Sequence, residues 1–313
     1  MPDALLAWGH GLVTRASDGV VLDAWFPAPA LGRPDGSTVP AELVAAAGPD
    51  ERRDVTLEPV TVEVRVDDAP ASTADAYLRL HLLSHLVVKP NEINLDGLFT
   101  HLPIVAFTNA GPVAADTYRA RRALLAREGI QAYAVDKFPR LTDYVVPERV
   151  RIADSARVRL GAYLSPGTTV MPEGFVNFNA GTLGASMVEG RISQGVVVGD
   201  GSDIGGGAST MGTLSGGGLQ RVVIGERVLL GANSGTGISI GDDSIVEAGL
   251  YLTAGTKVTV LDERDSEGDP KVVKALDLAG RPGLLFRRNS TSGRVEAAPH
   301  HGAGIALNAE LHP

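Results

Sequence analysis

The sequence lacks cysteine in all of its 313 residues, which excludes disulfide bonds and thiolate chemistry. It also lacks any apolar run of about 18 residues, so we expect no membrane-spanning segment. The N-terminal stretch 1–13 has no basic residue ahead of Leu5 and Leu6, a pattern that does not predict a signal peptide. Together these absences predict a protein of the cytoplasm.

Positive charge is also scarce, because 28 Lys and Arg stand against 37 Asp and Glu, a formal net charge of −9. Such a chain has no general attraction for nucleic acid or anionic membranes, and we expect neither as a partner. An anionic ligand would need a local cluster of Lys and Arg. Aromatic residues make up only 5% while glycines number 38, which favours thin, repetitive layers over a thick core.

What is present divides into three parts, which we expect to be an N-terminal α/β domain over 1–145, a β-helix over 146–260 and a C-terminal region over 261–313. Alternation and capping signals in the first part predict strands and helices. The expected strands are 20–26, 60–66, 104–107 and 130–135, and the expected helices are 72–89 and 114–128. Short strands are expected at 271–278 and 284–286, after a charged linker.

From residue 146 onward, apolar residues recur every six positions, and several are followed directly by glycine. The repeat runs through Ile152, Val158, Leu164, Val170, Val176, Thr182 and Val188, and then through Val198, Ile204, Thr210, Ile224, Leu230, Thr236, Ile240, Val246, Leu252 and Val258. A period of six fits a chain that forms one short strand, turns a corner and begins the next, so that three sides make a coil of about 18 residues. The alternative is a flexible glycine-rich array, which would not keep this register.

The repeat slips twice, between Val188 and Val198 and again over 211–221, which holds the run 214–218 rich in glycine. We expect the second slip to be an insertion at a corner. It is either a tolerated surface loop or a mobile segment that closes over a ligand.

The pattern resembles the hexapeptide-repeat family, whose fold is a left-handed parallel β-helix that usually trimerises, with active sites between neighbouring prisms. This resemblance implies a mainly β protein with an N-terminal α/β domain and a small C-terminal β region. The positions of the histidines then exclude two kinds of site, because none of the seven histidines lies within 146–260. A histidine general base on the helix and the three-histidine metal site of carbonic anhydrases are therefore excluded, and 1–30 lacks the glycine-rich start of a sugar-nucleotide transferase.

The most distinctive segment is 177–192, in which Glu189 follows Val188 and precedes Gly190 and Arg191. If Val188 points inward, Glu189 points outward, to a surface that a neighbouring prism can cover. A partly desolvated carboxylate there could serve as base or nucleophile. The alternative is a solvated carboxylate paired with Arg191.

Segment 181–191, with 199–209, 231–235 and 287–290, resembles the tetrahydrodipicolinate N-succinyltransferase family, closest to its actinobacterial branch. The resemblance implies transfer of succinyl from succinyl-CoA to the amine of tetrahydrodipicolinate, in its open 2-amino-6-oxopimelate form, in lysine and diaminopimelate biosynthesis. It assigns the catalytic role to Glu189, through an acyl-anhydride or as general base for direct attack. It implies succinyl-CoA contacts at Arg191, Gly206, Ser209, Ala232, Glu247, Ala248, Gly255, Lys274, Arg287, Arg288, Asn289 and Ser290.

Cationic side chains near the C-terminus agree with this assignment, since CoA and succinate are anionic. Lys271 remains an alternative to Lys274, and Arg287 with Arg288 could instead be a solvated basic pair. The branch also associates two acidic positions with magnesium near the trimer axis. Glu173 matches one, but the other falls at Ala156, so we expect at most a structural ion.

Two further functions stay open. One is a related CoA-dependent N-acyltransferase with a different donor or acceptor. The other is a non-enzymatic trimeric scaffold.

Overall fold

The computed structural model describes residues 5–34, 36, 38–215, 219–300, 302, 307 and 311–312. The chain forms two compact units, Met1–Val146 and Pro147–Pro313. None of the helices in the described residues is long and apolar enough to cross a membrane.

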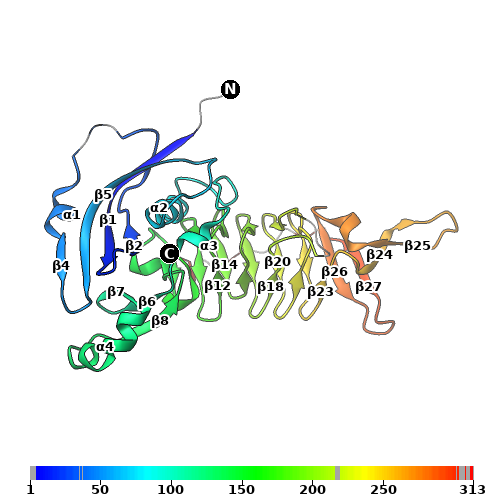
Figure 1. Ribbon diagram of the computed structural model, residues 1–313. Helices are drawn as coiled ribbons and strands as arrows, with labels where there is room; N and C mark the ends of the chain where they lie inside the picture. Colours follow the sequence, from blue (N-terminus) through cyan, green and yellow to red (C-terminus); the bar gives the residue numbers. More distant parts are fainter. Residues whose placement is uncertain are drawn as a thin grey trace. The chain divides into compact units, whose positions relative to one another are not determined.

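The N-terminal unit contains two antiparallel sheets with helices α2 and α4 (Figure 1). The larger sheet has the order β2-β1-β5-β4, with β3 also paired to β1, and the smaller has the order β7-β6-β8. The strands are β1 (Leu6–Ala16), β2 (Val21–Trp25), β3 (Ala30–Leu31), β4 (Gly48–Asp50), β5 (Val55–Arg65), β6 (Val105–Thr108), β7 (Gly111–Ala114) and β8 (Ala132–Asp136). The helices are α1 (Ala41–Ala45), α2 (Thr73–Ser84), α3 (Leu98–His101) and α4 (Ala115–Arg127), with a 3-10 turn η1 (Leu141–Asp143).

The expected elements of this unit are present, but one helix is shorter than expected and several further elements were not expected. Helix α2 begins as expected, because the Ser72 side chain accepts a hydrogen bond from the N–H of Asp75 and caps it. It ends at Ser84 and not near 89, since Leu86 has a φ of 60°, which breaks the helix ahead of Pro90. The elements that were not expected are β1, β3, β4, β7, α1 and α3, and the burial of β1 alternates only over its first half.

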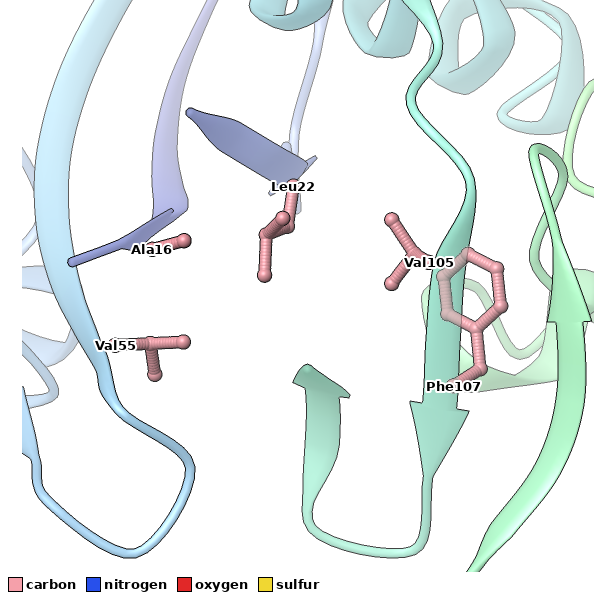
Figure 2. Packing of buried hydrophobic residues seen from close by; sticks show 5 residues of the cluster. All are labelled: Ala16, Leu22, Val55, Val105 and Phe107. Carbon is pink, nitrogen blue, oxygen red and sulfur yellow. The ribbon is translucent and has the colours of Figure 1, made fainter. Parts of the chain in front are cut away.

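A small apolar cluster joins the two sheets. Ala16 and Leu22 from β1 and β2, with Val55 from β5, face Val105 and Phe107 of β6 (Figure 2). Each of these side chains is nearly inaccessible to solvent. Their burial stabilises the contact of the sheets by removing apolar area from water.

The C-terminal unit is a three-sided prism of parallel strands, as the period of six predicts. The first face is β10 (Ala162–Leu164), β13 (Ala180–Thr182), β16 (Val197–Val198) and β19 (Val223–Ile224). The second face is β9 (Arg151–Ile152), β11 (Thr169–Val170), β14 (Ser186–Val188), β17 (Ser202–Ile204), β20 (Leu229–Leu230) and β22 (Ile245–Val246). The third face is β12 (Phe175–Val176), β15 (Arg191–Ile192), β18 (Ser209–Thr210), β21 (Gly235–Thr236) and β23 (Tyr251–Leu252).

The expected inward positions form the core of the prism. Strand pairing stacks one inward side chain on the next along the second face, in the order Val170, Val188, Ile204, Leu230 and Val246. Each of these side chains is fully buried. The other two faces repeat this arrangement. The glycine-rich array is therefore wrong as a description of 150–260.

The second face continues into the C-terminal segment, because β26 (Leu284–Arg288) pairs in parallel with β22. Strand β26 then pairs antiparallel with β27 (Val295–Pro299), which lies beside β24 (Lys257–Arg264). Strand β24 forms a hairpin with β25 (Pro270–Lys274), visible beyond the last coils in Figure 1. The expected linker over 262–270 comprises the end of β24, the turn 265–269 and the first residue of β25.

Candidate active site

The turns that lead from the second face to the third form one edge of the prism, which we call corner A. In successive coils they comprise 171–174, 189–190, 205–208, 231–234 and 247–250. Four of these turns have four residues, but the turn at Glu189 and Gly190 has two, as the bounds of β14 and β15 show. The slip expected after Val188 is thus a shortened corner, in which the N–H groups of Glu189 and Gly190 both donate to the carbonyl of Ile204.

The Glu189 side chain is half-buried and lies above the turn of the next coil. A Cβ atom built on Gly206 would stand 3.4 Å from Oε2 of Glu189. Among the described residues, the carboxylate makes no ion pair, so the expected alternative of a surface pair with Arg191 is not seen. Glu189 is therefore available for chemistry at this corner.

Backbone donors lie beside this carboxylate. Gly205 and Ala208 use their N–H groups in bonds to Leu230 and Gly205, but within the described residues the N–H groups of Gly206 and Gly207 donate no backbone hydrogen bond. Two available N–H groups next to a carboxylate suit an oxygen that gains negative charge during acyl transfer.

Corner A also holds four of the twelve residues expected to contact succinyl-CoA. Gly206, Ala232, Glu247 and Ala248 occupy successive turns, tied by bonds such as Asn233 N–H to the Gly206 carbonyl at 2.8 Å. On the adjoining third face, Arg191 and Ser209 are direct partners in strand pairing. Arg191 and Gly190 also line a surface cavity of about 470 Å³ with Arg157, Glu173, Phe175, Gly207 and Ala208.

The run 287–290 begins in the last two residues of β26 and continues beyond it, next to the last turn of corner A. The N–H of Arg288 donates to Oε2 of Glu247 at 2.6 Å. Nε of Arg287 donates to Oε2 of Glu296 at 3.1 Å, and Nδ2 of Asn289 donates to Oε1 of Glu296 at 2.8 Å. Arg287 is thus exposed but paired, because the buried Glu296 carboxylate accepts a hydrogen bond from its guanidinium.

Gly255 and Lys274 lie apart from this column, at the next corner of the last coil. The N–H groups of Ala275 and Leu276 donate to the carbonyls of Thr256 and Ala254, on either side of Gly255. Lys271 is paired with Glu263 at 3.2 Å, whereas Lys274 takes part in no ion pair among the described residues.

The acidic positions considered for magnesium do not form a site within one chain. Oδ1 of Asp154 accepts a hydrogen bond from the N–H of Ala156 at 2.9 Å, which commits it to a local turn. Glu173 is exposed in the cavity described above. Within the described residues no group of three metal-binding side chains exists. These residues do not fit a complete magnesium site, because Ala156 supplies no ligand atom.

Two side chains near Glu189 were not expected from the sequence. Asp203 lies on β17. Burial is the main cause that raises the pKa of Asp203, the charge of Glu189 raises it further, and the charge of His312 lowers it. Nδ1 of His312 lies 2.8 Å from the Gly167 carbonyl. Oδ1 of Asp203 and Nε2 of His312 are buried and have no hydrogen-bond partner in the part of the chain that the structure describes. A lone Asp in a repeat and a terminal His carry no sequence signal of this proximity.

The insertion over 211–221 lies at the corner between the third face and the first, as expected. It is closed by a bridge between Thr213 and Arg221. The expectation that it closes over a ligand falls on 216–218, which lie outside the described residues.

Comparisons with known proteins agree on one family. A family profile described as the hexapeptide repeat of succinyl-transferase matches residues 221–254, and one described as the middle part of tetrahydrodipicolinate N-succinyltransferase matches 102–140. The first is a repeat of the left-handed β-helix, which assigns that handedness to the prism.

Individual relatives cover most of the chain. A Pseudomonas aeruginosa protein named 2,3,4,5-tetrahydropyridine-2,6-dicarboxylate N-succinyltransferase is 61% identical over 248 residues, which are 79% of this chain and 71% of that protein. A Pseudomonas paraeruginosa protein of the same name is 60% identical over the same shares. A solved Campylobacter jejuni structure, described as a 2,3,4,5-tetrahydropyridine-2-carboxylate N-succinyltransferase, has a TM-score of 0.79 and 32% identity, covering 94% of this chain and 92% of the other.

Proposed function

This chain belongs to the tetrahydrodipicolinate N-succinyltransferase family, and on that premise we propose how corner A carries out the reaction. The enzyme transfers a succinyl group to tetrahydrodipicolinate in lysine and diaminopimelate biosynthesis. The donor in this proposal is succinyl-CoA, and the acceptor is the amine of the open 2-amino-6-oxopimelate form. The products are N-succinyl-2-amino-6-oxopimelate and CoA.

One observation carries the assignment of the catalytic group. Glu189 is a half-buried, unpaired carboxylate on a shortened corner, directly over the turn that contains Gly206. Oε2 of Glu247 on the same edge accepts the N–H of Arg288, and Glu173 is exposed. Glu189 is thus the half-buried carboxylate of this edge, and we assign it the role of reacting or accepting a proton.

The reaction can follow either of two routes. In one, a Glu189 oxygen attacks the thioester carbon, the C–S bond breaks and CoA leaves, and the acceptor amine then attacks the resulting anhydride. In the other, the amine attacks the thioester carbon directly while Glu189 takes its proton, and the C–S bond breaks to release CoA. In both, the thioester oxygen gains negative charge, which the N–H groups of Gly206 and Gly207 would stabilise.

The donor would lie along corner A toward the C-terminal end of the prism. Arg287, fixed by Glu296, and Arg288 would bind its phosphates. Lys274 would contribute at the neighbouring corner, because Lys271 is already paired with Glu263. Arg191, paired in register with Ser209, would bind the succinyl carboxylate.

We also propose a cytoplasmic homotrimer in which a second prism covers corner A. The cavity at Gly190 and Arg191 is open on one side in a single chain, so a neighbouring copy would complete its wall. Sedimentation analysis would measure three chains per particle if this is right.

The proposal predicts that release of free CoA thiol from succinyl-CoA requires the acceptor. Glu189→Gln should lower kcat at least about a hundredfold, as expected for loss of a general base or nucleophile. Glu226→Gln is the matched control, because Glu226 lies at another corner and pairs with Arg227. A Glu189→Gln protein with normal turnover would exclude the assigned role.

Isotope exchange separates the two routes. Labelled CoA enters succinyl-CoA in the absence of acceptor only when Glu189 forms the anhydride reversibly. Turnover without such exchange supports direct attack. Equal turnover with acetyl-CoA would favour the related N-acyltransferase, and lack of any CoA-ester binding would favour the scaffold.

A further inference from the structure

The N-terminal unit contains a cavity of about 440 Å³ between its two sheets, which the proposed reaction does not use. Its apolar wall is formed by Leu12 and Trp25 from β1 and β2, Leu57 from β5, and Phe107 from β6. Phe107 also belongs to the apolar cluster in Figure 2, so the cavity adjoins the contact between the sheets. Its volume lies within the usual range for small-molecule sites, about 300–1,000 Å³.

One end of the cavity holds a buried carboxylate. Asp23 is 6% exposed, and its Oδ2 accepts a hydrogen bond from the Tyr144 hydroxyl at 2.6 Å. Its Oδ1 is buried with no hydrogen-bond partner among the described residues. Native proteins rarely leave a buried acceptor unsatisfied, so a missing donor is the simplest explanation.

The cations nearest to this carboxylate are engaged elsewhere. Arg53 is buried, but its Nε donates to Asp50 at 2.8 Å and its Nη1 to the Pro112 carbonyl at 3.3 Å. Arg140 forms a pair with Asp143 at 2.8 Å and lies over the ring of Tyr133. No ion pair reaches Asp23 from any residue that the structure describes.

We propose that this cavity binds a small primary amine, whose ammonium group donates to Oδ1 of Asp23 and whose apolar body lies against Leu57 and Phe107. An ammonium supplies both the missing donor and the missing positive charge, and a charge-assisted bond of this kind is stronger than a neutral one. The engaged arginines leave no free cation for a carboxylate, so a simple amine fits better than an amino acid. The site makes the N-terminal unit a ligand-binding module.

Burial also affects the protonation of this carboxylate. It raises the pKa of Asp23, against the opposing effects of the Tyr144 hydroxyl, the side chain and backbone of Thr14, and the Arg53 charge. A bound ammonium would favour the ionised form and displace its proton.

Calorimetric titration of the full chain with benzylamine, and with benzyl alcohol as its neutral counterpart, tests the proposal. Benzylamine should bind, and benzyl alcohol should bind about ten- to a hundredfold more weakly, the ratio expected for a hydrogen bond to a charged group. Asp23→Asn should weaken benzylamine by the same factor. Glu58→Gln removes the same charge from β5 outside the cavity, where Glu58 pairs with Arg15, and should leave binding unchanged.

A second variant distinguishes loss of the binding site from loss of the fold. Leu57→Trp fills the cavity without altering its charges and should abolish benzylamine binding, while circular dichroism and the urea midpoint report an intact fold in both variants. No binding of either probe, equal binding of both, or normal binding by Asp23→Asn would overturn the proposal. Because the readout is amine binding, its failure is separate from failure of the transferase assignment.

Discussion

The buried histidine of α2 makes the stability of the N-terminal unit depend on pH. His81 is fully buried, with Nδ1 2.8 Å from the Tyr77 carbonyl and Nε2 without a partner among the described residues. Burial is the main cause that lowers its pKa from 6.5 to about 3. The folded state therefore keeps His81 neutral, whereas the unfolded chain protonates it below pH 6.5.

The sign and size of the effect follow from linkage. Between the two pKa values the unfolded state binds more protons, so the free energy of unfolding falls as pH falls. Integrated down to about pH 5, this single group removes about 2 kcal/mol of the stability present at neutral pH. The stability is fully present above pH 6.5 and is lost progressively toward pH 3.

Both tryptophans, Trp8 and Trp25, lie in this unit, so tryptophan fluorescence in urea follows its unfolding alone. We expect His81→Leu to be less stable than the wild type at neutral pH, but to lose about 2 kcal/mol less on acidification to about pH 5. His85, whose pKa burial also lowers, retains its contribution in both proteins. Parallel pH profiles for the two proteins would refute the reasoning.

The remaining predictions concern the donor site. Glu296→Gln frees the Arg287 guanidinium, and the rotamer entropy regained by an arginine should raise KM for succinyl-CoA about fivefold with kcat unchanged, as steady-state kinetics would show. Lys274→Ala should raise KM several-fold and Lys271→Ala should not, since Lys271 pairs with Glu263; the reverse order would transfer the role to Lys271.

The sequence predicts the prism well, because its core repeats one simple requirement. Each inward position needs a small or branched apolar side chain, and residues such as Val188 and Ile204 meet that requirement at regular spacing. The slip after Val188 was also visible in the sequence. The sequence did not show that this slip is a shortened corner. Only the strand bounds show that the corner of Glu189 is two residues shorter than the others.

Less of the site was predictable where partners are distant in sequence. Glu296 carries no motif, yet it fixes both Arg287 and Asn289 across the β26–β27 hairpin. Asp23 likewise accepts a hydrogen bond from the hydroxyl of Tyr144, which is 121 positions away in the sequence. Such pairs depend on tertiary contacts, which periodicity and local signals do not encode.

The antiparallel end of the prism has a consequence for how many coils can stack. Each coil is bonded only to the one before and the one after, so a parallel stack alone would end in free backbone donors and acceptors. Here β26 continues the second face and turns back through β27. A chain cut after Val260 would present an open edge to other copies, and growth of long fibres by addition of further chains is the expected fate of that fragment.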